Sequence, residues 1–406
     1  MGYRTLEKLF YADSSSDRFA RRERLLSERL NSESSFRTGI ELKTGELFMA
    51  VPRELSQASE LVLRRERRVS LAWRRLPRIA TRAYVLALIM DEVVSSNGME
   101  GVASTGRQIE LALEAGHAAA RDSRRPFQEF AHLYLGLVDG QVFPATLLDI
   151  RRVYDAVVRD ALEKRNRVDG DLFRSAEVEL VGSHGRILHE GVSPESKIKE
   201  MLGQWLTLAA NEDIPELYRA LLCHFLFEYI HPFYDGNGRT GRYLLSLQLS
   251  EALSLPTVLS LSRTIAENKN AYYKAFLSVE RPLNAAEATS FVLTMMELIG
   301  ATQEGLIADL EGRGRQLDEL GVRVDDLDGF DDRARRALYY VGQMSLFNAF
   351  GESRRDDMAA YLGVSPATAR KTLDLLAQRG LVRRVRQRPA IYVLTEAGKR
   401  RLGLEG

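Results

Sequence analysis

The residues best suited to chemistry lie together in one short stretch, residues 231–242, which reads HPFYDGNGRTGR. Gly236 and Gly238 flank Asn237 directly before a helix-forming run. We therefore expect free backbone N–H groups and the positive end of a helix dipole to point into one cavity. Such a cavity binds phosphate groups.

The charged side chains of the same stretch support this interpretation. Arg239 and Arg242 are three residues apart, so both can reach one anionic chain from the same helix face as permanently charged donors. Asp235 is a hard oxygen ligand that suits a magnesium ion shared with phosphate oxygens. His231 precedes Pro232, which favours non-helical backbone, and its imidazole can take up a proton near neutral pH. Each residue alone could be a helix cap or terminator, but the whole set has no simple packing explanation.

Two apolar segments, residues 220–230 and 243–253, flank this stretch and are expected to be helices that position it. Upstream, residues 173–194 are rich in Gly, Ser and Pro and alternate in polarity, which predicts a β-hairpin inside a helical region. A short strand is also predicted at residues 46–51.

Residues 231–242 resemble the signature of the Fic family, usually written HPFxDGNGRxxR, and match it at every fixed position. The resemblance covers roughly residues 80–300, through the upstream hairpin and a few further positions: Phe225, Phe227, Ile230, Asn268, Tyr272 and Tyr273. It implies a mainly α fold, with a helical core and a hairpin flap. It also implies transfer of AMP from ATP to a Ser, Thr or Tyr hydroxyl of a target protein or of the chain itself.

The resemblance assigns roles to individual residues. His231 would be the catalytic base, and Asp235 would hold Mg²⁺. The nucleotide would be bound by the loop and the helix that follows it, by a tyrosine and by the hairpin: Gly236, Asn237, Gly238, Arg239, Thr240, Gly241, Arg242, Tyr272, Val181, Gly182, Ser183 and His184.

A second motif, Ser96 to Gly101, matches the pattern of an inhibitory helix in Fic proteins. The resemblance implies that Glu100, supported by Ser96, pairs with Arg242 and takes the place of the γ-phosphate. The Asn97-Gly98 pair departs from a regular helix, because glycine costs roughly 1 kcal/mol inside a helix and Asn-Gly favours turns. The inhibition is therefore expected to be weaker than usual.

Near the C-terminus, the sequence predicts helices over 331–350, 356–362 and 367–379, with Ser365 as the N-cap and Pro366 in the first turn of the third. A hairpin is expected over 381–394. Together these elements resemble a winged helix-turn-helix domain. Its recognition helix would carry Thr368, Arg370, Lys371 and Thr372, and its wing Arg386 and Arg388.

Charge separates this region from the rest of the chain. The chain has 57 basic and 56 acidic residues, a net charge of +1, but residues 354–406 hold 12 basic and 5 acidic residues, or +7. DNA binding through residues 331–406 is expected, with a protein-interaction or dimerisation module as the alternative.

With 406 residues, the chain is expected to form two or three domains. The predicted division is an unassigned segment (1–45), a helical region with the inhibitory helix (46–120), the catalytic core (121–300), a helical linker (301–330) and the winged helix domain (331–406).

The lone cysteine, Cys223, cannot form an intramolecular disulfide, which favours a reducing, cytoplasmic setting. No stretch reaches the roughly 20 apolar residues that span a bilayer, and no secretory signal is evident, so no membrane association is expected.

Two further functions stay open at this level. The chain could be a DNA-binding regulator that uses the Fic fold to sense nucleotide, although sensing would not require His231. It could also remove AMP from a modified protein at the same site. The resemblance additionally suggests a homodimer.

Overall fold

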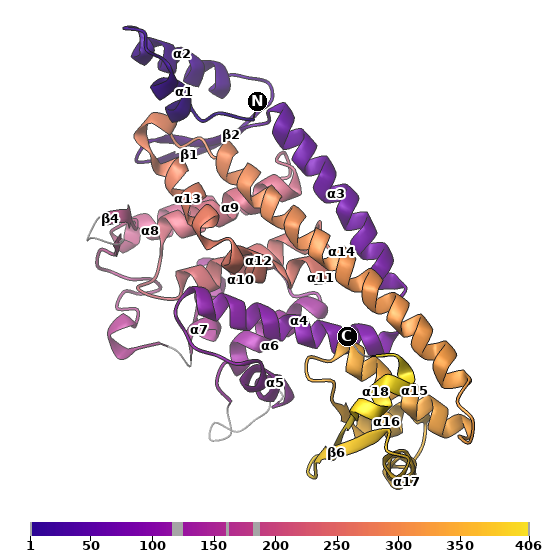
Figure 1. The fold of residues 1–406 in the computed structure, drawn as a ribbon. Helices are drawn as coiled ribbons and strands as arrows, with labels where there is room; N and C mark the ends of the chain where they lie inside the picture. The colour runs from indigo at the N-terminus through magenta and orange to yellow at the C-terminus, as the bar shows by residue number, and fades with distance from the viewer. Residues whose placement is uncertain (1, 116–124, 160–161, 182–186, 405–406) are drawn as a thin grey trace. The chain divides into compact units, whose positions relative to one another are not determined.

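The computed structural model describes residues 2–115, 125–159, 162–181 and 187–404. The chain is mostly helical with small antiparallel sheets, which confirms the expected mainly α fold (Figure 1). It divides into two compact units. The first comprises residues 1–66 and 89–303, and the second comprises residues 67–88 and 304–406.

The first unit begins with elements that the sequence analysis left unassigned. These are helices α1 (Leu6–Ala12) and α2 (Arg18–Leu30) and strand β1 (Ser35–Leu42), which pairs with β2 (Gly45–Ala50). The strand predicted at 46–51 is β2. Helix α2 has no buried residue, so it lies outside the apolar core of the unit.

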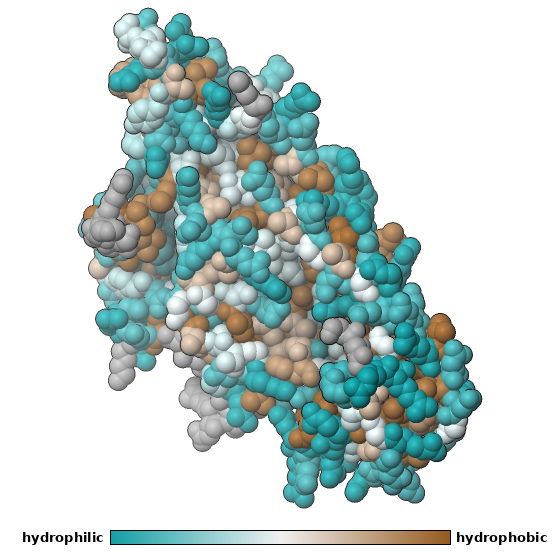
Figure 2. Space-filling model, in the orientation of Figure 1, coloured by the Kyte–Doolittle hydropathy of each residue, from teal (hydrophilic) through white to brown (hydrophobic). Residues whose placement is uncertain are grey.

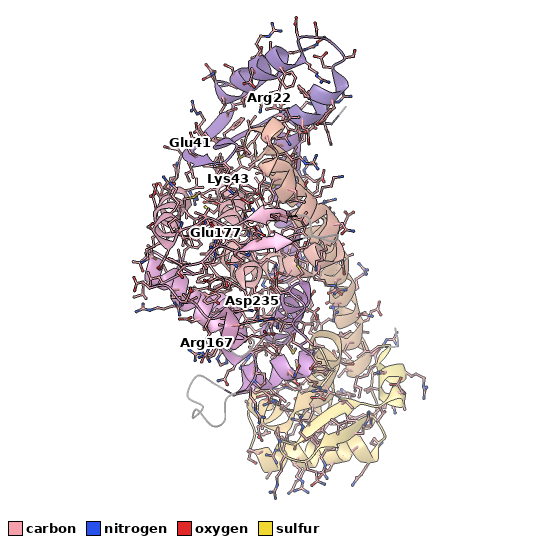
Figure 3. All side chains as sticks on the ribbon, turned by 90° about the vertical axis from the view of Figure 1, so that its left-hand side faces the viewer. Arg22, Glu41, Lys43, Arg167, Glu177 and Asp235 are labelled. Carbon is pink, nitrogen blue, oxygen red and sulfur yellow. The ribbon has the colours of Figure 1, made fainter. Side chains whose placement is uncertain are left out.

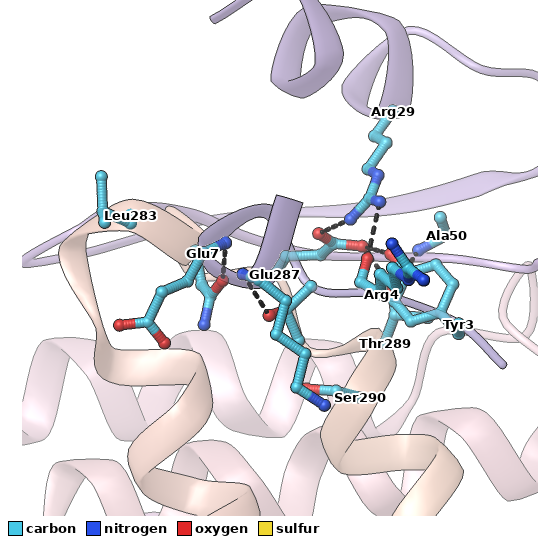
Figure 4. Close-up of polar contacts among 12 residues, drawn as sticks. Tyr3, Arg4, Glu7, Arg29, Ala50, Leu283, Glu287, Thr289 and Ser290 are labelled. Atoms are coloured by element: carbon cyan, nitrogen blue, oxygen red, sulfur yellow. Dashed lines mark hydrogen bonds and ion pairs between the residues drawn. The ribbon is translucent and has the colours of Figure 1, made fainter. Parts of the chain in front are cut away.

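Polar contacts attach this N-terminal segment to residues 284–289 (Figure 4). The Glu7 amide donates to Asn284 Oδ1 at 2.8 Å, and Arg29 Nη1 lies 2.6 Å from Glu287 Oε2. Thr289 Oγ1 links the Ala50 amide, at 2.9 Å, to Glu287, also at 2.9 Å. Burial raises the pKa of Glu287 to about 7. Residues 1–45 therefore belong to the same compact unit as the helical core.

The centre of this unit is α9 (Glu216–Ile230), which is buried on nearly all sides. It packs against α8 (Glu195–Ala209) and α10 (Asn237–Leu249), the two helices that bracket it along the chain. Cys223 lies in the middle of α9, where Trp205 Nε1 donates to its carbonyl at 2.8 Å and burial raises the pKa of its thiol to about 12. A continuous apolar run explains the burial of α9 on all sides.

The remaining helices of the first unit surround this centre or connect to it. They are α5 (Gly106–Glu114), α6 (Gln128–Val138), α7 (Leu147–Val158), the 3-10 helix η2 (Lys164–Asn166), α11 (Leu255–Val258), α12 (Leu261–Glu267), α13 (Lys269–Glu280) and the 3-10 helix η4 (Pro282–Asn284). Three longer helices contribute residues to both units: α3 (Arg53–Arg74), α4 (Arg78–Met99) and α14 (Thr289–Asp325).

The hairpin predicted within residues 173–194 is present. Strands β3 (Glu179–Val181) and β4 (Ile187–Glu190) pair antiparallel, with Glu179 opposite Glu190 and Leu180 opposite His189. The predicted nucleotide contacts Gly182, Ser183 and His184 lie outside the described residues, as does the side chain of Val181.

The second unit includes α15 (Asp332–Phe347), β5 (Ser353–Arg354), α16 (Arg355–Leu362), α17 (Pro366–Gln378), β6 (Val382–Arg386), β7 (Ile391–Leu394) and α18 (Glu396–Leu402). The strands form one sheet in the order β5-β7-β6. As predicted, Ser365 caps α17: its Oγ accepts from the Thr368 amide at 3.2 Å, and Pro366 occupies the first turn.

Among the described residues, one helix, α14, has the length and composition to cross a membrane, and 61% of its most apolar window is buried in the structure. A buried core helix meets the same criteria. On the face shown in Figure 2, hydrophobic residues occur singly or in small groups among hydrophilic ones.

Candidate active site

Local contacts fix the conformation of the loop between α9 and α10. His231 ends α9 in the left-handed conformation (φ 51°), and its amide donates to Phe227 O at 3.1 Å. Phe233 is fully buried and stacks on Tyr154. Asn237 closes the loop, because its Oδ1 accepts from the Phe233 amide at 3.0 Å and its Nδ2 donates to Phe233 O at 2.7 Å. The side chain of Asn237 therefore holds the two ends of the loop together.

The imidazole of His231 is oriented through its Nδ1 atom, which lies 3.3 Å from the carbonyl oxygen of Glu228. A carbonyl only accepts, so this contact requires hydrogen on Nδ1 and leaves the Nε2 lone pair unprotonated. Burial, reinforced by the nearby His189, lowers the pKa of His231 to about 3. The side chain is thus a neutral base with a defined accepting atom.

A residue that the sequence analysis missed, Arg174, fixes the backbone of this loop. Its Nε donates to His231 O at 2.8 Å, and its Nη1 and Nη2 donate to Ala176 O and Val192 O, each at 2.7 Å. Gly191 makes room for it, since a Cβ there would lie 2.4 Å from Arg174 Nη2. Arg174 therefore ties the ends of the hairpin segment to His231. No sequence pattern marks it, because its partners are backbone carbonyls, two of them 18 or more residues away along the chain.

Helix α10 begins without a side-chain cap. Gly236 is the N-cap with φ 82°, and within the described residues no side-chain hydrogen bond caps the helix. A Cβ at Gly236 would lie 2.3 Å from Val158 Cγ1, so both the backbone conformation and the space require glycine. The first N–H groups of α10 remain available to an anion.

Arg239 is completely buried, yet none of its three guanidinium nitrogens has a hydrogen-bond partner among the described residues. Its nearest carboxylate is Asp235 Oδ1, at 3.6 Å from Nη2. Burial lowers the pKa of Arg239, but guanidinium remains charged at neutral pH. A buried cation whose donors lack partners destabilises the folded state, unless a bound ligand accepts hydrogen bonds from it.

Arg242, one turn further along α10, is fully engaged with the end of α4. Its Nε donates to Ser96 Oγ at 3.0 Å, and its Nη2 donates to Ser96 O at 2.8 Å and to Glu100 Oε1 at 2.9 Å. Burial lowers the pKa of Arg242, but Glu100, Tyr272 and Glu228 together more than offset this, so the net shift is upward. A Cβ on Gly238 would lie 2.2 Å from Glu100 Oε1, so the carboxylate sits directly over the first turn of α10.

Helix α4 presents this carboxylate from just beyond its last residue. The helix continues through Asn97 and Gly98 to Met99, although Asn-Gly favours a turn, and Gly101 then adopts φ 73°. Asn97 is buried and donates to Ser104 Oγ at 3.1 Å, which offsets the low helix propensity. Lys269 Nζ donates to Met99 O at 2.9 Å and so caps the helix end.

Glu92 anchors α4 one turn before Ser96. It accepts from the Tyr134 hydroxyl and from the Ser262 amide, each at 3.0 Å. Because Glu92, Ser96 and Glu100 are spaced four residues apart, the buried anchor and the two Arg242 contacts follow one side of α4. The sequence analysis found the last two members and missed the first.

The other proposed nucleotide contacts differ in accessibility. Tyr272 is buried, and its hydroxyl lies 2.7 Å from His224 Nε2, whereas Tyr273 is 39% exposed. Thr240 Oγ1 donates to Gly236 O at 2.8 Å. Gly241 packs on Glu228, whose pKa is raised to about 8 by burial. These residues therefore support the loop. The hydroxyl of Tyr272 is already hydrogen-bonded within the protein.

For a magnesium ion, Asp235 offers one partly exposed carboxylate (32%) at the mouth of the site. No group of three or more His, Cys, Asp or Glu residues that could hold a metal occurs in the described part of the chain. A single carboxylate suits Mg²⁺ that is held jointly with phosphate oxygens, and not a cation held by protein ligands alone.

Beside the hairpin lies a cavity of about 360 Å³ whose lining includes Glu41, Lys43, Glu177 and Gly191. Figure 3 labels the first three of these, together with Asp235. The cavity adjoins the base, because a Cβ on Gly191 would lie 3.1 Å from His231 Cβ.

Comparisons with known proteins agree with this geometry. Residues 144–249 match the model of the Fic/DOC family. A protein named protein adenylyltransferase Fic, from Drosophila yakuba, is 27% identical over 190 residues, which is 45% of this chain and 35% of the relative. Protein adenylyltransferase fic-1 of Caenorhabditis elegans is 32% identical over 112 residues, covering 27% of this chain and 22% of the relative.

Among solved structures, a Fic family protein from Desulfovibrio desulfuricans G20 aligns with a TM-score of 0.52 at 17% identity, covering 86% of this chain and 97% of the other. That similarity shows the fold. The matched segments span about a third or less of the length of the curated relatives quoted above. The resemblance of residues 231–242 to the Fic signature is confirmed, since they lie within residues 144–249, which match the Fic/DOC family model.

Proposed function

With a Fic domain as the premise, we propose that this chain is a protein adenylyltransferase. It transfers AMP from ATP to a Ser, Thr or Tyr hydroxyl of a target protein or of itself. Glu100 inhibits this transfer by occupying Arg242.

One observation supports this most directly. Two buried arginines lie one turn apart on α10, and within the described ranges the single carboxylate in hydrogen-bond contact with them is Glu100, on Arg242. Arg239 keeps all its donors unsatisfied among the described residues. This excess of buried positive charge, at the open N-terminus of α10, matches a chain of phosphates that carries several negative charges.

The proposed reaction uses groups at defined positions. The target hydroxyl oxygen attacks the α-phosphorus of ATP, and its proton passes to His231 Nε2. The bond from the α-phosphorus to the bridging oxygen of the β-phosphate breaks, and pyrophosphate leaves. Arg239, Arg242 and the first N–H groups of α10 stabilise the negative charge that develops on the leaving phosphates.

Arg174 and the hairpin prepare the other reactant. Arg174 fixes the carbonyl of His231 and thereby the position of the base. The target segment would lie against β3 and β4 and enter the cavity that adjoins Gly191, so that its hydroxyl reaches His231. A magnesium ion, held by Asp235 and by phosphate oxygens, would neutralise part of the phosphate charge.

Inhibition follows from the same geometry. The Glu100 carboxylate covers Gly238 and holds Arg242, so it occupies both the space and the cation that a γ-phosphate needs. ATP would then bind without its phosphates in the productive position. Hydrogen bonds to charged groups contribute about 1.5–3 kcal/mol, so release of Glu100 should raise the rate by about 10- to 100-fold.

The decisive experiment is transfer of label from ATP labelled on the α-phosphate, with magnesium, to the chain itself and to a cell lysate. Glu100→Gly should label strongly and wild type weakly, and Glu100→Gly combined with His231→Ala should not label. Glu212→Gly, which removes one exposed carboxylate elsewhere in the first unit, is the matched control and should behave as wild type.

Adding Gly238→Ala to Glu100→Gly provides a second check, because the methyl group would stand where Glu100 Oε1 now lies. It should abolish the gain in labelling. Equal labelling of wild type and Glu100→Gly would refute the inhibitory role. Faster loss of label from a modified target with wild type than with Glu100→Gly would instead favour AMP removal.

A further inference from the structure

Basic residues concentrate on α17 and the hairpin that follows it, in the second unit. Between residues 370 and 388 the chain holds seven arginines and lysines and one acid, Asp374. The Fic reaction uses none of them. The arrangement of their side chains decides what this charge can contact.

Helix α17 is amphipathic, and its core side is occupied by Ala369, Thr372, Leu373 and Leu376. Thr372, which the sequence analysis placed among the recognition residues, is only 7% exposed, and its Oγ1 donates to Thr368 O. It is therefore part of the packing. On the opposite side, Arg370 and Lys371 are exposed, and Arg370 has only a long contact of 3.7 Å with Asp374.

The first strand of the hairpin and the turn after it are exposed from Arg383 to Pro389, whereas β7 is mostly buried. Strand β6 is at the edge of the sheet, and from Arg383 onward every residue of the strand is exposed. Lys371, Arg384, Arg386 and Arg388 make no ion pair with any described residue.

Other cations of this unit are already engaged within the fold. Arg379 and Arg401 lie over the ring of Phe330, and Lys399 pairs with Glu396 at 2.9 Å. Lys371 and the hairpin arginines therefore differ from these cations, and α17 and β6, which carry most of them, contact each other in the fold.

We propose that α17 and the β6–β7 hairpin form a binding surface for double-stranded DNA. An exposed helix fits the major groove of B-form DNA, which is about 12 Å wide, whereas the major groove of A-form RNA is too deep and narrow for side chains to read. Arg370 and Lys371 face the base edges from α17. The exposed hairpin arginines contact the phosphates beside the helix.

The test is binding of full-length protein to a fluorescent 30-base-pair duplex of random sequence, measured by anisotropy at several salt concentrations. Binding should weaken as salt rises. The triple variant Arg384→Gln, Arg386→Gln, Arg388→Gln should bind more weakly. It should also lower the slope of log affinity against log salt by about 2.7, because each of three neutralised phosphates contributes about 0.9 to that slope.

The matched control removes three exposed arginines from the first unit, through Arg64→Gln, Arg152→Gln and Arg165→Gln. It should leave the slope unchanged. Lys371→Ala should broaden the set of sequences selected from a random library, and Thr372→Val should not.

Three results would overturn the proposal: no duplex binding at low salt, equal weakening in the triple variant and its control, or stronger binding to double-stranded RNA or to an acidic protein than to DNA. Label transfer from ATP by the triple variant in the Glu100→Gly background shows that the first unit is folded, independently of DNA binding.

Discussion

Two helices of this chain carry basic residues in their first two turns, and their N-termini are built in opposite ways. At α10 the cap is Gly236, no side-chain hydrogen bond from the described part of the chain caps the helix, and Arg239 and Arg242 are buried. At α17 the cap is Ser365, whose hydroxyl accepts from the backbone, and the arginine and lysine of the helix are exposed. The first arrangement leaves backbone donors for a small anion inside the fold. The second satisfies a backbone donor internally and leaves only side chains, which suits an extended polyanion outside.

The comparison predicts that the largest loss of activity follows substitution of Arg239, one of the two buried cations of α10. Arg239→Gln in the Glu100→Gly background should lower AMP transfer by about 100- to 1,000-fold, because a preorganised donor to the leaving phosphates is removed. Initial rates with ATP labelled on the α-phosphate measure this. Arg21→Gln, an exposed arginine of the same unit, is the control. Similar rates in both variants would show that α10 does not bind the phosphates.

A smaller loss of activity is expected when the contact that fixes the loop before α10 is removed. Arg174→Met should lower kcat by about 10- to 100-fold, because His231 loses the donor that fixes its carbonyl. Affinity for ATP, measured with a fluorescent analogue, should be unchanged, since Arg174 contacts no residue of α10 in the described structure. Arg174→Lys should not restore the rate, because one ammonium group cannot serve three separated carbonyls. Loss of nucleotide binding along with kcat would indicate a general structural role.

At α17 the expected effect concerns stability. Ser365→Ala should destabilise the helix by about 1 kcal/mol, a factor of about five, because the cap on Thr368 is removed. Hydrogen exchange of the α17 amides measures this, and Ser365→Asp should retain protection. Unchanged hydrogen exchange in Ser365→Ala would show that the Ser365 cap does not stabilise α17. Capping would then not be a difference between the N-termini of α17 and α10.

The smallest expected effect is a flat pH profile. Burial places the pKa of His231 near 3, below its ordinary value, so the imidazole is unprotonated at every pH from 5.5 to 7 and would become protonated only as the pH falls towards 3. In the same window Glu228 remains protonated, since its pKa is about 8. The kcat of Glu100→Gly, at saturating ATP, should therefore change little over this range. A tenfold fall per pH unit below about 6.5 would show an imidazole with its ordinary pKa.

Sequence reasoning found the parts of the site that are contiguous in the chain or carried by a short motif. Residues 231–242, the hairpin strands and the pairing partner of Arg242 all have local signals. Arg174 and Glu92 could not be found in this way, because their partners are backbone atoms or side chains distant in sequence. The burial of Thr372 was available from its spacing to Ala369 and Leu376, since residues three and four apart share a helix face.

The N-terminal segment shows the same limit in the fold. Helices α1 and α2 bury few side chains, and the segment is attached largely by polar contacts to residues 284–289. The pattern of apolar residues cannot report such an attachment, whereas continuous apolar runs predicted helices at 220–230 and 243–253 that overlap α9 and α10.

The lone cysteine gives the protein an internal reporter. Thiol reagents react with the thiolate form of cysteine. The Cys223 thiol lies inside α9, the helix directly before the loop that carries His231, and its pKa is near 12. In the folded chain the Cys223 thiol is therefore unreactive, and an alkylating reagent can label it only when α9 unfolds locally. The rate of alkylation then measures how often α9 unfolds locally. Any ligand that binds the buried arginine site should slow this alkylation, whether or not AMP is transferred.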